Sequence, residues 1–549
     1  MKKIISTVLA AAIGISTMVS FASCSQDTIS PEEAIPIFYE TKTASEIVER
    51  IENMGDPSKE NEQLIEQIFI DYTTLPQSEK EKVTNYSKLD EARNAITKLY
   101  CTEEKDGPRF DRSKIQIGTY CLYNTSEERI KWLNEAGIDF VAGAPYNMDV
   151  LDLFSKYNIG AFISYLPGWY GDDGSNGGTL AANRPSGIYN SYAESFVDHP
   201  AIQAVDVGDE PSALDFPHYG ILIEEAKELF PNQLVYLNIY PIYANEEQQG
   251  TVKYEDYIQI YVDNIDTDYL SFDFYDIDKV AEKENSGSDY FMLRHIENLR
   301  IVAHACKEKG IDLWTVMQAG TYSDETGDYI TVDQLNTQLY TALAFGSQVI
   351  NWACWESGWF DANSNMIDSS GNRTPSYYHV QEVNANIKAL SPVYMRYNNT
   401  DTAFVGNLDA VRQRGTMNGT DDLNFIEKDG NIFEQDMFQN IEVSYDGANI
   451  LAGSFEKKDG EGSAILFSNV TEFYGRYDGV LDGYVENETQ ISFTLKEQDH
   501  KVVIYYPNLA YELKPDANGI YSFSLRNADG VFITAEPDAD SVENAETEE

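Results

Sequence analysis

The sequence has few cysteines, few histidines and few basic residues for its length. Its 549 residues include 5 Cys and 6 His, and 39 Lys and Arg stand against 91 Asp and Glu, so the net charge is −52. Affinity for phosphate backbones comes from Lys and Arg, so this charge disfavours binding to DNA, RNA or anionic lipid headgroups. It disfavours a polyanionic substrate as well. The solvated surface of an exported protein would account for most of the charge.

The sequence motifs typical of metal sites, nucleotide-binding sites and serine hydrolases are also missing. The histidines show neither HExxH nor close pairing, and no EF-hand spacing occurs, so no metal site is expected. No glycine-rich nucleotide loop or GxSxG elbow follows a predicted strand, and no cofactor is expected. Four cysteines lack the CxxC pairs and the density of a disulfide scaffold, and we interpret them as mostly buried apolar side chains: Cys101, Cys121, Cys306 and Cys354.

The only long apolar run lies at the N-terminus. Met-Lys-Lys followed by apolar residues 4–22 is typical of an export signal over residues 1–24. The segment FASC at 21–24 resembles a bacterial lipobox, which implies that Cys24 is lipidated and becomes the mature N-terminus. The alternative is an ordinary cleaved signal. No other run approaches the ~20 residues of a membrane span, so we expect a lipid anchor to be the protein's only membrane attachment, at the extracellular face of the cell membrane.

A small helical module is predicted over residues 38–105, after a spacer at 25–37 rich in Ser, Asp, Pro and Glu. The runs at 71–76 (DYTTLP), 83–86 (VTNY) and 89–92 (LDEA) resemble the small helical repeats of Gram-positive surface proteins. We interpret this module as a spacer without a ligand. Two sites have the spacing of a helix-capping box: Ser78 with Glu81, and Thr125 with Glu128.

Residues 110–398 predict a (β/α)8 barrel. Short apolar strands alternate with amphipathic helices, and eight such alternations favour a closed barrel over an open sheet. The predicted strands are Ile115–Cys121, Phe140–Pro145, Ala161–Leu166, Ile202–Pro211, Leu234–Pro241, Tyr269–Ile277, Leu313–Gly320 and Gln348–Glu356.

A change of periodicity marks the C-terminal part. Over residues 399–535 the helical pattern gives way to alternation with period two, and turns rich in Gly, Asn and Asp separate the strands, which predicts a β-sandwich. Residues 536–549 are acidic and contain no aromatic residue, so a disordered tail is expected there.

The active site of such a barrel forms at the carboxyl ends of its strands. The fourth predicted strand ends with Asp206, Asp209 and Glu210, an acidic concentration that suggests a chemical task. Strict alternation along this strand would place Asp206 and Glu210 on one face and Asp209 on the other. Glycosidic cleavage commonly uses two carboxyl groups. Because strands four and eight face each other, Glu356 is one candidate partner of Glu210, and Asp273 on the sixth strand is the other.

Aromatic residues gather at the same predicted rim, where flat rings could stack on sugar faces. Core packing is the alternative explanation for each of them singly. The residues that we select as candidates for substrate contact are Tyr120, Trp169, Tyr240, Tyr275, Trp355 and Trp359.

Short segments of the chain resemble clan A glycoside hydrolases, including family 42 β-galactosidase-like barrels. They are HPAI at 199–202, GDEP at 208–211 and LAFG at 343–346. The resemblance implies that Glu210 is the acid/base catalyst. The chain departs from that pattern twice: Asp209 stands where Asn is usual, and Gln318 stands where the nucleophilic Glu is expected. The Asp-Glu pair also resembles substrate-assisted hexosaminidases, in which Asp orients an acetamido group and Glu is the acid, although Asp209 would then need a bulge to re-aim it.

These patterns predict a lipid-anchored glycoside hydrolase that cleaves O-glycosidic bonds of an oligo- or polysaccharide with Glu210 as its acid. Asp273 or Glu356 would act as nucleophile, base or cation stabiliser, and Asp209 and Gln318 would contact substrate. Two alternatives stay open: a substrate-assisted enzyme that uses Asp209 and Glu210, and a surface glycan-binding lipoprotein that has lost catalysis, which the residue Gln318 motivates.

Overall fold

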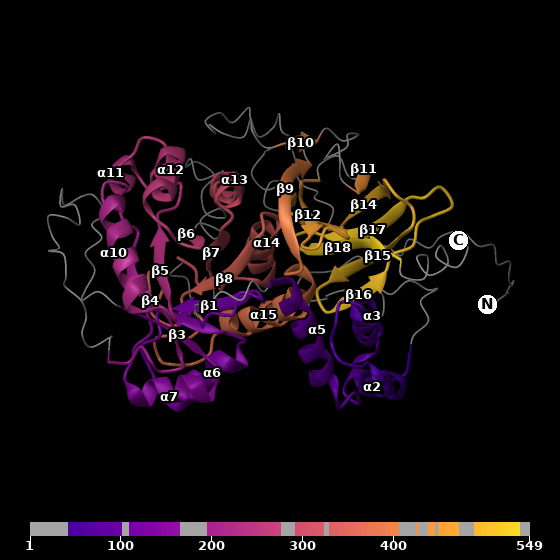
Figure 1. Ribbon diagram of the computed structural model, residues 1–549, viewed down its shortest axis with the longest axis horizontal. Coiled ribbons are helices and arrows are strands. Elements are labelled where there is room, and N and C mark those ends of the chain that lie inside the picture. The colour runs from indigo at the N-terminus through magenta and orange to yellow at the C-terminus, as the bar shows by residue number, and fades with distance from the viewer. Residues whose placement is uncertain are drawn as a thin grey trace, which may run out of the picture.

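A computed structural model describes nine segments of the chain: residues 42–101, 109–164, 195–275, 291–322, 329–405, 424–426, 437–444, 448–471 and 488–538. The predicted signal, spacer and Cys24 lie outside the described residues. No helix within these segments is long and apolar enough to cross a membrane. The molecule contains a barrel, a pair of mainly antiparallel sheets and a group of N-terminal helices that packs against both (Figure 1).

The barrel consists of eight parallel strands that close in sequence order, which confirms the predicted fold class. Each predicted strand is present, with ends that differ by a few residues. The strands are β1 (Gln116–Tyr120), β2 (Phe140–Ala142), β3 (Gly160–Ser164), β4 (Ile202–Asp209), β5 (Leu234–Ile239), β6 (Tyr269–Phe274), β7 (Asp312–Gln318) and β8 (Ser347–Ala353).

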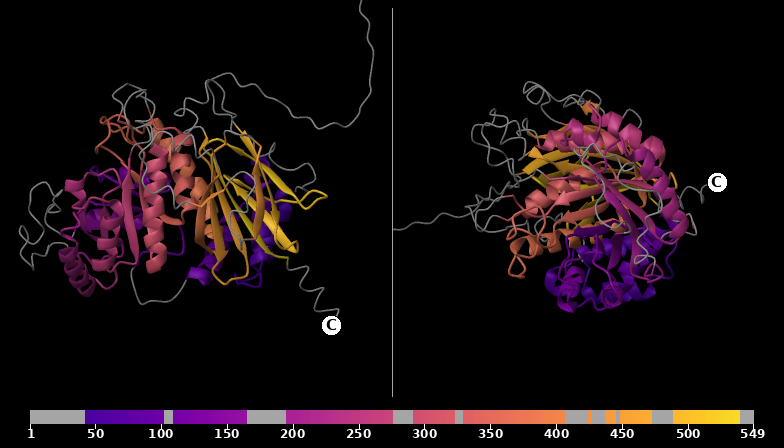
Figure 2. Two further views of the ribbon diagram at one scale, coloured as in Figure 1. Left: turned by 90° about the horizontal axis from the view of Figure 1, so that it is seen from above. Right: turned by 90° about the vertical axis from the view of Figure 1, so that its left-hand side faces the viewer.

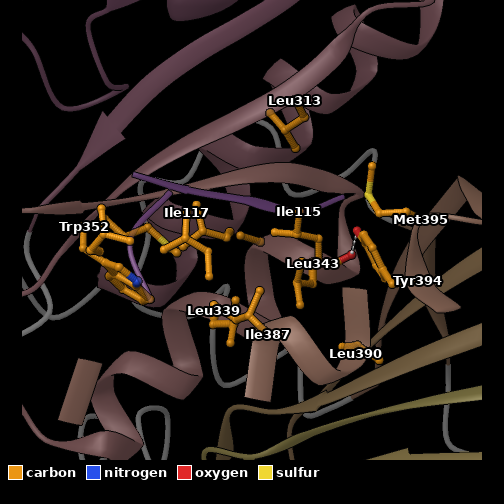
Figure 3. Packing of buried hydrophobic residues seen from close by; sticks show 14 of the residues in the cluster. Ile115, Ile117, Leu313, Leu339, Leu343, Trp352, Ile387, Leu390, Tyr394 and Met395 are labelled. Carbon is orange, nitrogen blue, oxygen red and sulfur yellow. Dashed lines mark hydrogen bonds between the residues drawn. The ribbon is translucent and has the colours of Figure 1, made fainter. Parts of the chain in front are cut away.

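Helices surround the barrel and cover the apolar outer faces of its strands (Figures 1 and 2). They are α6 (Glu127–Glu135), α7 (Met148–Lys156), α10 (Phe216–Leu229), α11 (Glu246–Gln249), α12 (Tyr254–Asn264), α13 (Phe291–Lys309), α14 (Val332–Ala344) and α15 (Pro375–Tyr394). Figure 3 shows the packing at one side, where Ile117 of β1 and Leu339 of α14 belong to the same buried cluster as Ile387 of α15.

Aromatic rings fill the interior of the barrel. The rings of Phe140 and Phe162 stack with centroids 4.3 Å apart, and those of Tyr269 and Trp314 stack at 4.0 Å. Phe110, which precedes β1, packs on Phe140, Phe162 and Trp314. These residues belong to one buried cluster. The barrel is therefore a filled core, and chemistry is left to the strand ends.

Two sheets follow the barrel, as the period-two pattern predicts, and their strands pair antiparallel except for β10, which pairs parallel with β9. One sheet has the order β10-β9-β12-β13-β18-β15-β16 and the other β11-β14-β17. Their strands are β9 (Tyr397–Val405), β10 (Asn424–Ile426), β11 (Phe438–Val443), β12 (Ile450–Lys457), β13 (Ser463–Asn469), β14 (Glu488–Leu495), β15 (His500–Tyr506), β16 (Leu509–Glu512), β17 (Tyr521–Arg526) and β18 (Gly530–Pro537). Strand β18 includes Glu536, so the tail predicted from residue 536 begins too early.

The N-terminal helices are α2 (Ala44–Asn53), α3 (Glu62–Thr73), α4 (Gln77–Lys80) and α5 (Tyr86–Cys101). Neither predicted capping box forms: α4 begins after Pro76 and α6 after Ser126, each without a side-chain cap. A box does form at Thr43 and Glu46. The spacing of two residues is too short a pattern to distinguish sequences that form a capping box from those that do not.

Buried ion pairs join the three parts of the molecule. Arg396, which follows α15, contacts Glu62 at 2.9 Å and Glu66 at 3.4 Å, and both acids lie on α3. Arg93 of α5 contacts Glu66 at 2.9 Å, and Lys457 of β12 contacts Glu62 at 3.2 Å. Lys457 also contacts Glu536 of β18 at 3.0 Å. Each charge in this network has an opposite partner, which offsets part of the free energy lost on burial.

We expect Arg396→Met to lower the free energy of unfolding by about 3 to 5 kcal/mol, because it leaves buried carboxylates with fewer partners. Urea denaturation would measure the loss. The matched control is Lys88→Met, which breaks an exposed pair with Glu52 and should cost under about 1 kcal/mol. Equal losses in the two variants would contradict a special role for the buried network.

Candidate active site

Four carboxyl groups meet at the carboxyl ends of barrel strands β4 and β6. Asp206 and Asp209 lie on β4, Glu210 follows it directly, and Asp273 lies on β6. Asn238 of β5, the strand between them, contacts two of the four: its amide nitrogen donates to Asp273 Oδ1 at 2.8 Å and to Asp209 Oδ1 at 3.2 Å. The amide therefore bridges acids from two different strands.

An irregularity in β4 brings Asp209 and Glu210 into the same cluster. The register between β4 and β5 shifts between Asp206 and Gly208, and Glu210 has a left-handed backbone with φ of 48°. Strict alternation is therefore wrong at this point. Gly208 allows the local packing, because a Cβ at this position would lie 2.6 Å from the Tyr219 hydroxyl. The bulge re-aims the end of the strand.

Hydrogen bonds continue the cluster into the interior of the barrel. The Ser271 hydroxyl donates to Asn238 Oδ1 at 2.9 Å. The Tyr236 hydroxyl lies 3.1 Å from Ser271 Oγ and 2.5 Å from the Tyr120 hydroxyl. These contacts fix the orientation of the Asn238 amide, since its oxygen accepts while its nitrogen donates to the acids.

Desolvation raises the pKa of all four acids, and repulsion from neighbouring acids adds to the rise for Asp206, Glu210 and Asp273. Desolvation, with the charge of Asp273 second, raises the pKa of Glu210 to about 10. Desolvation and the charge of Asp209 raise the pKa values of Asp206 and Asp273 to about 8. Desolvation raises the pKa of Asp209 to about 6, against the hydrogen bond from Asn238. Asp209 is also the most exposed of the four, which favours its ionised form.

Glu210 and Asp273 contact each other directly. The protonated Glu210 carboxyl donates a hydrogen bond to the Asp273 carboxyl group. A glycosidic bond held between two catalytic carboxyl groups needs a separation of about 5 Å for retention and about 6.5 to 9.5 Å for inversion. The described pair is closer than either. In this conformation Asp273 accepts a hydrogen bond from Glu210. The two side chains have to separate before a sugar can enter between them.

Glu356, the other predicted partner, binds the backbone instead. Its Oε1 accepts hydrogen bonds from the amides of Tyr123 and Asn124, both at 2.6 Å. These amides lie in the loop after β1. The described contacts of Glu356 thus fasten this loop to the segment after β8, and they do not join it to Glu210.

Three of the predicted aromatic residues form a cluster beside the acids. The ring of Trp359 lies 5.3 Å from that of Tyr275 and 6.3 Å from that of Tyr120. Phe360 packs on Tyr275 at 5.6 Å and on Tyr322 at 4.8 Å. Trp359 is 43% exposed, so it presents a ring to solvent next to the acid cluster.

Three of the remaining predicted contact residues are buried and not available to a substrate. Trp355 is fully buried and packs on Tyr377 of α15, and Tyr240 is buried against Tyr257 of α12. Both rings point outward to the helices, so their prediction as stacking residues is wrong. Gln318 is fully buried as well, and its amide donates to the Gly320 carbonyl at 2.8 Å. Trp169 lies outside the described residues.

Sequence reasoning missed the polar residues that support the acids. Asn238, Tyr236 and Ser271 stand inside apolar strands, where each looks like a packing residue. The useful signal was their place near the ends of β5 and β6, beside the acidic strand β4. Within the described segments, no three His, Cys, Asp or Glu residues have an arrangement that could hold a metal ion.

Neither a family model nor a curated protein matches this chain. Among solved structures, a GH30 endoxylanase from Clostridium papyrosolvens C71 is similar, with a TM-score of 0.39 and 12% identity over 79% of this chain and 98% of that one. An endo-1,4-β-D-mannanase from Thermotoga petrophila RKU-1 has a TM-score of 0.35 and 13% identity over 49% and 99%. A family 5 mannosidase from Rhizomucor miehei has a TM-score of 0.33 and 12% identity over 52% and 94%. These structures are glycoside hydrolases, and the barrel of this chain is defined by its own closed strand order.

The raised pKa values predict that stability falls as pH rises. Between the unfolded and the folded pKa of each acid, the unfolded chain has lost a proton that the folded chain keeps, so a higher pH favours unfolding. We expect Glu210→Gln to reduce the loss of stability between about pH 5 and about pH 8 by on the order of 1 kcal/mol, allowing for the partial exposure of Glu210.

Thermal unfolding at the two pH values would measure this difference. Glu127→Gln is the control, because Glu127 is an exposed acid paired with Lys156 and lies outside the cluster. A pH dependence of Glu210→Gln that equals the wild type would show that Glu210 does not keep its proton in the folded protein.

Proposed function

We propose that this protein is a glycoside hydrolase that cleaves O-glycosidic bonds of an oligo- or polysaccharide, with Glu210 as general acid. The observation that carries the proposal is the separation of pKa values at the end of β4, where Glu210 lies at about 10 and Asp209 at about 6. Near neutral pH the site therefore holds a proton donor beside a carboxylate. Two acids whose environments separate their pKa values are suited to opposite roles in acid and base chemistry.

The chemistry follows from these charges. Glu210 donates its proton to the leaving oxygen as the glycosidic bond breaks. The carboxylate of Asp209 stabilises the positive charge that develops on the sugar ring in an oxocarbenium-like transition state. Trp359 and Tyr275 offer apolar ring surface for the CH faces of a sugar, while the acids and Asn238 offer hydrogen bonds to its hydroxyls.

The sequence resemblance supports the same role for Glu210. GDEP at 208–211 resembles the fourth-strand motif of clan A enzymes, including those of family 42, and in that motif the Glu is the acid/base. The buried, uncharged Gln318 at the end of β7 offers no nucleophile. We therefore assign the negative charge of the site near neutral pH to Asp209, and the partner of the protein is a carbohydrate.

A substrate-assisted reaction is a second candidate. It requires adjacent Asp and Glu residues to reach one site, which an unbroken strand does not allow. In this chain the register shift in β4 and the left-handed Glu210 bring both residues to the bridging region of Asn238 and Asp273. Asp209 would then orient the acetamido group of an N-acetylated sugar, and Glu210 would protonate the leaving oxygen.

An assay with aryl glycosides and with glycans that have unactivated leaving groups tests the role of Glu210. We expect Glu210→Gln to lower kcat by about 10² to 10⁴ on unactivated glycans, as for loss of a general acid. The loss should be much smaller on nitrophenyl glycosides, because their leaving groups depart without protonation. Cleavage restricted to N-acetylated sugars would favour the substrate-assisted candidate.

Glu127→Gln again serves as the control, with unchanged turnover. Binding of glycans without any product release would overturn the enzymatic proposal and leave a surface glycan-binding protein. Equal turnover by Glu210→Gln and wild type on unactivated glycans would remove Glu210 from its role.

We also propose that the protein is exported and anchored at the extracellular face of the membrane through lipidated Cys24, its only membrane attachment. The charged start, the apolar run and the FASC segment support this proposal. We expect metabolic labelling with a fatty-acid probe to mark the wild type and to leave Cys24→Ser unlabelled and released into the medium. Retention of both proteins in the cytosol would contradict it.

A further inference from the structure

Two cysteines stand side by side where β1 and β8 end. These strands pair in parallel as far as Thr119 opposite Trp352, and Cys121 and Cys354 each follow two residues further on. The two segments stay joined past the strands, because the Trp355 amide donates to the Tyr120 carbonyl at 2.9 Å. Parallel strands lie about 4.8 Å apart, and a disulfide needs Cα atoms about 4.4 to 6.8 Å apart. Positions just past the ends of two paired strands are therefore within reach of such a bond.

The two thiols are neighbours and are not bonded. Both cysteines are free, and each affects the pKa of the other's thiol. A Cβ on Gly358 would lie 2.3 Å from Cys354 Sγ and 3.3 Å from Cys121 Sγ, so the backbone of Gly358 covers both sulfurs. A side chain at this position would displace them.

Polar groups adjoin the pair on both sides. The Tyr123 hydroxyl adjoins the Cys121 thiol, and the Trp359 amide adjoins the Cys354 thiol. The pair therefore lies between two exposed aromatic residues. Apolar residues enclose the inner end, where Cys354 belongs to a buried cluster with Tyr275 and Phe360.

The two thiols differ in reactivity. Cys121 is partly exposed, and the hydrogen bond from Cys354 lowers the pKa of its thiol, which favours the nucleophilic thiolate. Cys354 is buried, and desolvation raises the pKa of its thiol. Cys121 is therefore the thiol that meets a reagent from solvent, and Cys354 is placed to react with whatever forms on Cys121.

We propose that Cys121 and Cys354 are a reversible dithiol–disulfide pair at the mouth of the barrel, oxidised by small organic disulfides. The Cys121 thiolate attacks a disulfide RSSR, forms Cys121–S–SR and releases RS⁻. The Cys354 thiol gives up its proton and attacks Cys121 Sγ, which releases the second RS⁻. In total, two protein thiols and RSSR give one protein disulfide and two RSH, so the two electrons pass to the small disulfide.

Oxidation acts on the loops that border the candidate active site. The bond links the segment before Tyr123 to the segment before Trp359. Glu356 joins the same two segments from the other side, through the amides of Tyr123 and Asn124. The redox state of the pair thus sets how firmly the ring of Trp359 is held. This inference goes beyond the proposed function and does not depend on it.

Peptide mapping of the full-length protein after treatment with oxidised glutathione tests the pair. In the wild type we expect a disulfide-linked peptide that joins Cys121 to Cys354, which dithiothreitol reverses. In Cys354→Ser, which lacks the second thiol, glutathione should stay attached to Cys121. In Cys121→Ser neither product should form.

Cys101→Ser is the matched control, because Cys101 is also partly exposed and lies far from the pair in the fold, at the end of α5. It should keep the 121–354 link. We expect Cys121 to react at least about tenfold faster than Cys101, in line with its stabilised thiolate. Wild-type mapping needs no variant, so the test holds even if a serine variant fails to fold. Absence of the linked peptide in the wild type would overturn the proposal, as would glutathione distributed equally over Cys101 and Cys121.

Discussion

The site depends on keeping four carboxyl groups together against their own repulsion. The ends of two barrel strands carry these groups: Asp206, Asp209, Glu210 and Asp273. Among the described residues, no Lys or Arg side chain contributes to their pKa values. Like charges at this distance cannot all ionise, so protons are retained and the groups hydrogen-bond instead. A closed barrel supplies the rigidity that this arrangement needs, because its strands cannot separate without breaking the sheet.

The hydrogen bonds beneath the acids explain how the cluster stays ordered. Asn238 has its oxygen occupied by Ser271, which leaves its two amide hydrogens for Asp209 and Asp273. Such an amide favours negative charge on its acceptors without adding a positive charge of its own. It therefore offsets part of the rise in the pKa of Asp209 and of Asp273. Glu210 is the acid that keeps its proton to the highest pH. The contact with this side chain thus favours the carboxylate role proposed for Asp209.

The barrel could be predicted from the sequence because apolar strands and amphipathic helices repeat eight times, and such a pattern tolerates errors of a few residues. The acid-rich end of β4 could be located for the same reason. The direction in which single side chains point could not be predicted. A register shift beside Gly208 moved Asp209 and Glu210 to one site, and the outward rings of Tyr240 and Trp355 depend on a one-residue choice of face. Partners such as Asn238 come from distant strands, and periodicity carries no information about them.

The contacts between the parts of the molecule leave little room for relative movement. A Cβ on Gly453 of β12 would lie 2.2 Å from the Ala344 carbonyl oxygen at the end of α14, and one on Gly530 of β18 would lie 2.2 Å from the Tyr340 ring. The ion pairs of Glu62 and Glu66 add the N-terminal helices to this assembly. Tension applied through the polypeptide before α2 would therefore pass into α15 and the seven-stranded sheet together. Because the contacts described above hold these parts to one another, the barrel opening would keep its orientation under mechanical load.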